Sequence, residues 1–203
     1  MKPKPRHLPL TAPHIVVMPA ERMAVVETTG DPNEVGKQAI QALYSSVYTL
    51  KFAQKKLNRD FRVKPLRARW LNLRNPKRTA LHGLWGLAIP SGTRRVPQRS
   101  HALRVGVDTW KYGKVAEILH LGSYAAEQPT IRRLLAFVHE QGYEVDGPHE
   151  EEYLSRPDAR VPKTLIRYAV RKAHRRASVA EVSQRGSHAD RNPAVTRRAS
   201  RFH

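Results

Sequence analysis

The run Glu150-Glu151-Glu152, followed by Tyr153, holds the residues best suited to chemistry in this sequence. The segment 149–154 is expected to form a β-strand, in which side chains alternate between two faces. Glu151 and Tyr153 then share one face, and Glu150 and Glu152 share the other. A carboxylate held among aromatic rings is partly desolvated, which suits it to bind a cation or to act as a general acid or base. The alternative for Glu151 is an ordinary solvated position at a strand edge.

Aromatic residues that could wall a binding cleft occur in three places. Trp70 and Trp85 lie on predicted strands at inward-facing positions, and large flat side chains of this kind hold planar ligands. The alternative for both is ordinary core packing, which is the more common role. Tyr44 and Tyr48 are one helical turn apart, so that both are candidates to border a cleft. Tyr124 follows a glycine turn, where it either contacts a ligand or anchors the turn.

Other catalytic and metal-binding patterns are absent from the sequence. There is no cysteine, and the ten histidines are not spaced to share a helix face. No phosphate-binding loop, dinucleotide fingerprint or nucleophile elbow is found. We therefore expect no metal and no cofactor. His120 lies on the opposite face of a predicted strand from Glu117, and it is expected to be a hydrogen-bonded core residue and not a catalytic base.

The net charge is strongly positive and unevenly distributed. The 203 residues carry a formal charge of +20, from 37 Lys or Arg against 17 Asp or Glu. Fifteen of the basic residues lie between residues 51 and 104, where Asp60 is the one acid, and residues 174–203 contribute +5. A balance of this kind favours anionic partners such as nucleic acid.

Two groups of basic residues are candidates for weak, salt-sensitive contact with DNA or RNA. The predicted loops contribute Arg74, Lys77, Arg78, Arg94, Arg95 and Arg99, and the C-terminal segment contributes Arg175, Arg176, Arg197 and Arg198. The alternative is that this charge serves solubility or reflects an arginine-rich composition. We favour the alternative because the sequence contains no helix-turn-helix or other reading head.

The elements that position these residues follow from apolar periodicity and from glycine and proline. Asp31 and Pro32 are a helix cap and a first helical residue, which predicts a helix from there to about Leu57. Pro129 and Gly142 bracket a second helix in the same way. Short apolar or alternating runs predict the strands, at residues 15–18, 23–26, 67–71, 84–89, 105–110, 115–121, 149–154 and 164–170.

The order of these elements repeats. The spacing from Ala24 to Gly30 equals the spacing from Ala116 to Gly122, and each glycine is followed by a helix and then by two strands. We therefore predict an α+β fold made of two pseudo-symmetric β-α-β-β repeats. The repeats share an antiparallel sheet, with two long helices on one face.

Composition divides the chain into three parts. Residues 1–13 are expected to be a flexible basic leader, 14–172 the folded domain, and 173–203 a basic, disordered tail with too few apolar residues to fold. No run of eighteen apolar residues is present, and the N-terminus lacks the apolar core of a secretory signal. We therefore expect a cytoplasmic protein with no membrane partner.

Several segments resemble the GyrI-like small-molecule-binding family. The similar segments are residues 116–124 and 127–131, a strand, turn and helix; 142–145 and 147–154, a late strand; 161–168, a closing segment; and 30–32 with 43–52 in the first half. This family shares its fold with the effector-binding domains of AraC- and MerR-type regulators. The resemblance implies a ligand cleft between two helices, with Glu151 as the pocket glutamate and Trp85 as a pocket tryptophan.

The resemblance also sets the functions to be tested. The first hypothesis is a multidrug-type binding protein that binds, sequesters or detoxifies a hydrophobic or cationic aromatic compound, through Glu151 and the walls formed by Trp70, Trp85, Tyr48, Tyr124 and Tyr153. The second is a hydrolase of strained, cyclopropane-bearing electrophiles, with Glu151 as the catalytic residue. The third is a basic nucleic-acid-associated protein. An inhibitor that binds another protein, as gyrase-inhibitory relatives do, has no marker in the sequence.

Overall fold

The computed structural model describes residues 10–173 except 76, 78 and 157. The chain divides into two units, Met1–Lys172 and Ala173–His203, and only the first is described below. The predicted flexible leader over 1–13 and the predicted disordered tail over 173–203 lie outside the described residues except for 10–13 and 173, and both stay predictions.

The described part of the chain contains two α-helices, one short 3-10 helix and nine strands. In chain order they are β1 (His14–Met18), β2 (Glu21–Gly30), α1 (Pro32–Lys56), β3 (Arg67–Trp70), β4 (Leu81–Ala88), β5 (Gly106–Trp110), β6 (Gly113–Leu121), η1 (Tyr124–Ala126), α2 (Gln128–Glu140), β7 (Tyr143–Val145), β8 (His149–Tyr153) and β9 (Lys163–Lys172). The α+β class and the predicted order of strands and helices are confirmed. The short strand β7 was not predicted, because three residues are too few to show alternation.

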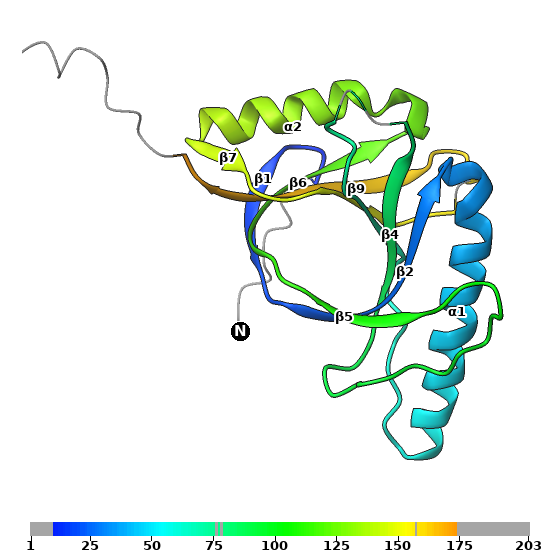
Figure 1. The fold of residues 1–203 in the computed structure, drawn as a ribbon. Helices are drawn as coiled ribbons and strands as arrows, with labels where there is room; N and C mark the ends of the chain where they lie inside the picture. Colours follow the sequence, from blue (N-terminus) through cyan, green and yellow to red (C-terminus); the bar gives the residue numbers. More distant parts are fainter. Residues whose placement is uncertain (1–9, 76, 78, 157, 174–203) are drawn as a thin grey trace, which may run out of the picture. The chain divides into compact units, whose positions relative to one another are not determined.

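The strands form one curled antiparallel sheet (Figure 1) in the order β1-β6-β9-β8-β3-β4-β2-β5, with β7 paired to β9. The strands that follow α1 and those that follow α2 meet in the middle of the sheet, where β3 pairs with β8. Each of the two edge strands pairs with the half of the sheet that is more distant in the sequence. Strand β1 precedes β2 in the chain but pairs with β6, and β5 precedes β6 but pairs with β2.

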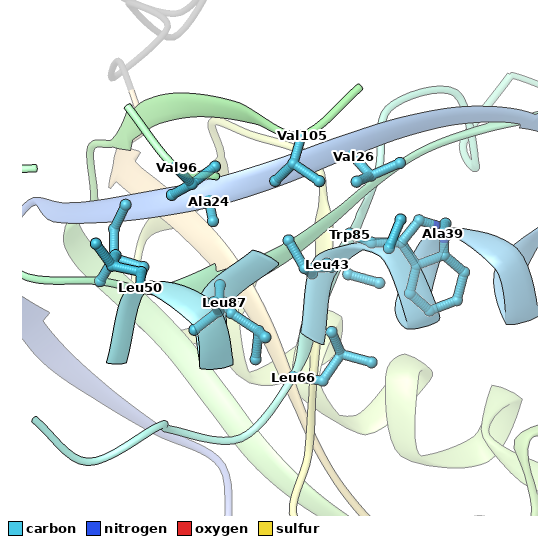
Figure 2. Close-up of a cluster of buried hydrophobic side chains, with 14 of the residues drawn as sticks. Ala24, Val26, Ala39, Leu43, Leu50, Leu66, Trp85, Leu87, Val96 and Val105 are labelled. Carbon is cyan, nitrogen blue, oxygen red and sulfur yellow. The ribbon is translucent and has the colours of Figure 1, made fainter. Parts of the chain in front are cut away.

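Helix α1 begins and ends where the sequence predicts. The Asp31 carboxylate accepts a hydrogen bond of 2.9 Å from the backbone N–H of Asn33, and Pro32 occupies the first turn. One face of the helix packs on β2 and β4, with Ala39 and Leu43 fully buried against Val26 and neighbouring side chains (Figure 2). This contact fixes the helix over the first half of the sheet.

Helix α2 covers the other half of the sheet. Ile131, Leu134 and Val138, at helical spacing, are buried against Ile118 and other residues of β6 and β9. Gly142, with a φ of 69°, lies just after the helix, in the left-handed conformation that the sequence predicts. Both helices contribute residues to one cavity together with strand residues, so they lie on the same face of the sheet.

The opposite face of the sheet carries buried ion pairs. Arg167 on β9 donates from Nε to Glu117 at 2.7 Å, and its Nη1 pairs with Glu152. Arg69 on β3 donates to Glu150 at 2.7 Å. Glu150 and Glu152 therefore face away from the helices, and the alternation predicted for β8 is confirmed.

No helix in the described ranges is long and apolar enough to cross a membrane.

Candidate ligand-binding cavity

A cavity of about 1330 Å³ lies between the two helices and strands β3, β4 and β8. It is larger than the roughly 300–1,000 Å³ that is usual for small-molecule sites. The aromatic residues that line it are Tyr44, Tyr48, Trp70, Trp85, Tyr124 and Tyr153. Three further lining side chains are buried and titratable, namely Glu127, His149 and Glu151.

The aromatic wall is a continuous set of ring contacts. Trp70 and Trp85 meet edge to face, with centroids 5.3 Å apart, and Trp85 stacks on Tyr153 at 6.3 Å. Tyr153 in turn meets Tyr124 edge to face at 5.8 Å. The indole N–H of Trp85 donates to the hydroxyl of Thr28 at 3.0 Å, which fixes the orientation of that ring. Stacked and edge-to-face pairs of this kind are favourable arrangements of aromatic rings.

A glycine on the neighbouring strand makes room for Trp70. A Cβ atom at Gly83 would lie 2.6 Å from Cζ3 of the Trp70 ring, closer than side chains approach. The indole therefore lies close to the backbone of β4 at Gly83, and Trp70 is only 7% exposed.

Glu151 is held by two residues of its own strand, one of which also contacts β9. The Tyr153 hydroxyl donates to Glu151 Oε2 at 2.7 Å, and His149 Nε2 lies 2.9 Å from Oε1. The other ring nitrogen of His149 is 2.8 Å from the hydroxyl of Tyr168. Residues 149, 151 and 153 share the cavity face because a strand repeats every two residues. Burial and the adjacent Glu151 charge raise the pKa of Tyr153 well above its ordinary value, so its hydroxyl stays protonated and donates.

Glu127 enters the same cavity from the start of α2. It is 6% exposed, and its Oε1 atom has no hydrogen-bond partner among the described residues. Burial first, and the Glu151 charge second, raise the pKa of Glu127 to about 8. Its carboxyl group is therefore mostly protonated at neutral pH, and a cation placed beside the pair would ionise it.

Among the described residues, one group of side chains is arranged so that it could hold a metal ion. It consists of Glu127, His149 and Glu151, whose candidate ligand atoms all lie within 4.8 Å of one another. Two carboxylates and one imidazole suit a divalent transition metal. However, both ring nitrogens of His149 already have partners, Glu151 and Tyr168, so a metal would have to replace the first contact. The expectation of no metal stays a prediction.

All the predicted site residues line this one cavity. Glu151, Trp70 and Trp85 are buried in its wall, Tyr153 is half-buried, and Tyr48 and Tyr124 are more open, at 42% and 45% exposure. Trp70 and Trp85 also belong to the hydrophobic core. Each indole therefore packs in the core and lines the cavity at the same time. That these residues bind a ligand, and that Glu151 is catalytic, stay predictions.

Two residues of the cavity were missed from the sequence. His149 could have been found, because it lies two residues before Glu151 on the same strand face. Glu127 could not, since only the packing of α2 against the sheet brings it next to β8. His120 was predicted correctly as a structural residue, with contacts of 2.9 Å to the Thr130 hydroxyl and 3.0 Å to the Ser123 carbonyl oxygen.

The basic loop residues do not line the cavity. Arg74, Lys77, Arg94, Arg95 and Arg99 are all exposed. Arg78 lies outside the described residues.

A large, half-enclosed cavity with aromatic walls and a few convergent polar groups is the usual form of a small-molecule site. A family model described as the GyrI-like small molecule binding domain matches residues 11–170. The chain therefore belongs to the GyrI-like small-molecule-binding family. No curated protein matches it.

Solved structures share the fold at low identity. An uncharacterized conserved protein from Listeria innocua is 24% identical, with a TM-score of 0.69, over 80% of this chain and 94% of its own. A hydrolase from Listeria innocua is 24% identical, with a TM-score of 0.68, over 81% and 94%. The C-terminal domain of EcmrR is 12% identical, with a TM-score of 0.60, over 79% and 98%. At these identities the likeness bears on the fold alone.

Proposed function

We propose that the protein binds a hydrophobic, cationic aromatic compound in the cavity and so sequesters it. The observation that carries this proposal is the Glu127–Glu151 pair, buried beside the aromatic wall and facing the cavity. Glu127 has no ion pair with a basic residue of the described chain, and its Oε1 accepts no hydrogen bond. A cationic ligand would supply the missing positive charge, while the rings of Trp85 and Tyr153 would contact its apolar body.

The size and the charge of the cavity favour this class over others. At about 1330 Å³ it accommodates a ligand of several fused or linked rings. Buried carboxylates disfavour anionic groups beside them, because like charges repel strongly where water is excluded. A neutral aromatic compound gains only the apolar contacts.

Crystal violet and its uncharged leuco form test the proposal as a matched pair. We expect quenching of tryptophan fluorescence to show tighter binding of the cation. Glu127→Gln and Glu151→Gln should each weaken crystal violet binding by roughly tenfold, about 1.4 kcal/mol, and change binding of the leuco form little. Glu140→Gln, an exposed position at the end of α2, is the control. Equal affinity for both dyes, or no effect of the cavity variants, would contradict the proposal.

Hydrolysis of a strained, cyclopropane-bearing electrophile is the second candidate function, and one feature favours it. A protonated Glu127 lies beside Glu151, whose oxygens contact His149 and Tyr153. In the proposed reaction Glu151 takes a proton from water, the water oxygen bonds to a ring carbon, and the strained carbon–carbon bond breaks. Glu127 gives its proton to the atom that receives the released electron pair.

The two candidate functions, hydrolysis and binding alone, predict different effects of the substitution Glu151→Gln. Mass spectrometry of a cyclopropane-bearing electrophile incubated with the protein should show addition of one water molecule. Glu151→Gln should abolish this turnover and retain binding of the unreacted compound. Turnover that is unchanged in the variant would remove Glu151 from the catalytic role.

We also infer that the two halves of the sheet are pseudo-symmetric repeats, with the cavity where they meet. The first half has the strand order β2-β4-β3 and the second has β6-β9-β8, so each half has its first strand outermost and its middle strand at the junction. The turns agree, since Gly30 has a φ of 138° and Gly122 a φ of 135°. A cytoplasmic location remains part of the proposal on compositional grounds.

A further inference from the structure

A buried tyrosine that does not line the cavity contacts a residue of the cavity wall. Tyr168 on β9 is 2% exposed and packs in the core cluster that α2 covers. Its hydroxyl lies 2.8 Å from Nδ1 of His149, and the two rings meet edge to face with centroids 5.2 Å apart. His149 in turn reaches Glu151 through Nε2, at 2.9 Å. The three side chains form a chain of contacts from the core to the cavity.

The strand register brings these three residues together. Glu150 is level with Arg167 across β8 and β9, so the next level pairs His149 with Tyr168. Residues directly opposite each other in an antiparallel pair project from the same face of the sheet. Glu151 shares that face because it lies two residues from His149 on one strand. The contacts are therefore built into the sheet and not into a loop.

The donors and acceptors fix the direction of each contact. Burial raises the pKa of Tyr168 to about 12, so its hydroxyl keeps its proton at neutral pH. This hydroxyl has no other hydrogen-bond acceptor among the described residues, and it therefore donates to Nδ1 of His149. A neutral imidazole that accepts at Nδ1 carries its own hydrogen on Nε2, and Nε2–H then donates to Glu151.

The other forms of the imidazole leave a buried proton without an acceptor. A hydrogen on Nδ1 would point at the oxygen of Tyr168, whose own hydrogen would then have no acceptor in the described structure. An unpaired polar group is costly where water is excluded. Only the Nε2–H form pairs every proton of the chain of contacts.

This direction leaves the negative charge of the cavity on Glu151. Both of its oxygens accept a hydrogen bond, one from His149 and one from Tyr153, as an ionised carboxylate can. With a hydrogen on Nδ1, either Glu151 would supply the proton that lies between it and Nε2, or the ring would be a cation. Both of these states remove the net negative charge that a cationic ligand needs.

We propose that Tyr168 and His149 are positioning residues of the cavity. Tyr168 holds His149 in the Nε2–H form, and His149 thereby keeps Glu151 as the carboxylate that selects a cation. This inference rests on the proposed function and names the residues that set its preference for a cationic over a neutral compound. Tyr168 acts in this way without lining the cavity.

Nitrogen NMR of the His149 ring tests the hydrogen-bond direction without any ligand. In a long-range proton–nitrogen correlation spectrum we expect a bare Nδ1 and a protonated Nε2 in the native protein. The signals of His149 are identified by their loss in His149→Gln. In Tyr168→Phe, Nδ1 should become protonated in a substantial fraction of molecules, because the hydrogen that it accepted is gone. A native ring protonated on Nδ1, or a ring unchanged in Tyr168→Phe, overturns the inference.

Dye binding tests the effect on selectivity. Tyr168→Phe should weaken crystal violet binding by roughly fivefold and change binding of the leuco form by less than about twofold, as for the loss of one buried hydrogen bond. Tyr143→Phe is the matched control. Its ring packs against the same core cluster outside the cavity, and its hydroxyl accepts a hydrogen bond from Lys114 at 3.0 Å. Equal effects of the two variants overturn the inference.

Two substitutions of His149 separate positioning from packing. The amide N–H of Gln can replace Nε2–H as the donor to Glu151, whereas Leu fills the space without a donor. His149→Gln should keep crystal violet affinity within about threefold of the native value, and His149→Leu should lower it by roughly tenfold. Binding of the leuco form reports that each variant is folded. An equal loss of crystal violet affinity in both folded variants would show that His149 only fills space.

The outcomes separate this inference from the proposed function. If crystal violet binds in preference to its leuco form and Tyr168→Phe leaves that preference unchanged, the proposed function stands and the inference falls. If the native protein does not bind crystal violet, the proposed function fails, and the nitrogen spectrum still decides which form of His149 is present.

Discussion

Glu127 and Glu151 approach each other in the cavity without a basic side chain to neutralise both charges. Glu151 accepts a hydrogen bond from the Tyr153 hydroxyl, whereas Glu127 Oε1 accepts none, so the proton of the pair belongs on Glu127. This single proton gives the cavity two states. The protonated state suits a neutral ligand, and the ionised state suits a cation.

The raised pKa of Glu127 makes both stability and binding depend on pH. Between its ordinary value of 4.5 and its folded value of about 8, the folded chain holds a proton that the unfolded chain has released. The free energy of unfolding therefore falls with rising pH through this window on account of Glu127. In Glu127→Gln this contribution is gone, so the variant should gain stability relative to the native protein as pH rises, in urea unfolding measured at several pH values.

Binding of a cationic dye should depend on pH in the opposite sense. Cation affinity is expected to increase as pH rises through about 8, because the ionised carboxylate binds the cation. Isothermal titration calorimetry at different pH values, with Glu127→Gln as the reference, measures this. A native pH profile that coincides with that of the variant would show that Glu127 does not titrate in this range.

At the scale of single elements, the strand-to-helix turns decide where each helix starts. Gly122 has a φ of 135°, a backbone conformation that side chains other than glycine rarely adopt, and its N–H donates to the Pro162 carbonyl oxygen at 3.0 Å. This turn sets the position of η1 and α2, and hence of Glu127.

Gly122→Ala should lower the free energy of unfolding by roughly 1–2 kcal/mol, since the new Cβ forces strain on the turn. Gly92→Ala is the matched control, because a Cβ there meets no atom within 4 Å. Urea denaturation compares the two variants. Equal stabilities would mean that the turn relaxes without cost.

At the scale of the whole unit, buried ion pairs join the two halves of the sheet on the face opposite the cavity. Arg67 on β3 donates to the Tyr112 hydroxyl at 3.0 Å, and its Nε lies 3.3 Å from Glu152 on β8. Arg167 continues the set to β6 through Glu117. The network therefore spans the junction where β3 pairs with β8, directly behind the cavity residues of β8.

Removing Arg167 should be far more destabilising than removing a surface arginine. Arg167→Met removes a buried cation that is shared by Glu117, Glu150 and Glu152, at a cost of roughly 3–5 kcal/mol, although Arg69 and Arg67 remain beside Glu150 and Glu152. Arg171→Met, on the same strand but half exposed and paired with Glu144 and Asp146, should cost less than about 1 kcal/mol. Thermal unfolding of both variants tests the difference, and similar melting temperatures would show that the network adds little.

The basic C-terminal segment is expected to affect DNA affinity and not ligand affinity. Deleting residues 174–203 removes +5 of the +20 charge, and we expect it to leave crystal violet affinity unchanged, because the cavity lies within residues 31–156. Any affinity for DNA should fall with added salt and weaken further on deletion. Titration of both chains with a DNA duplex at several salt concentrations measures this. Salt-independent DNA binding would point instead to a specific interface.

The sequence by itself determined the elements and part of the site. Asp31, Pro32 and Gly142 act through local backbone geometry, so the ends of both helices were predictable from a few residues. Alternation along β8 separated Glu151 and Tyr153 from Glu150 and Glu152, because a strand has only two faces.

Only the tertiary structure determined which side chains contact the two faces of β8. Glu127 and Glu151 are 24 positions apart in the sequence, and only the packing of α2 on the sheet places their carboxyl groups within one cavity. The exchange of β1 and β5 between the halves likewise arises from strand pairing. Local patterns cannot specify such contacts, because they depend on which strands become neighbours and on the burial that follows.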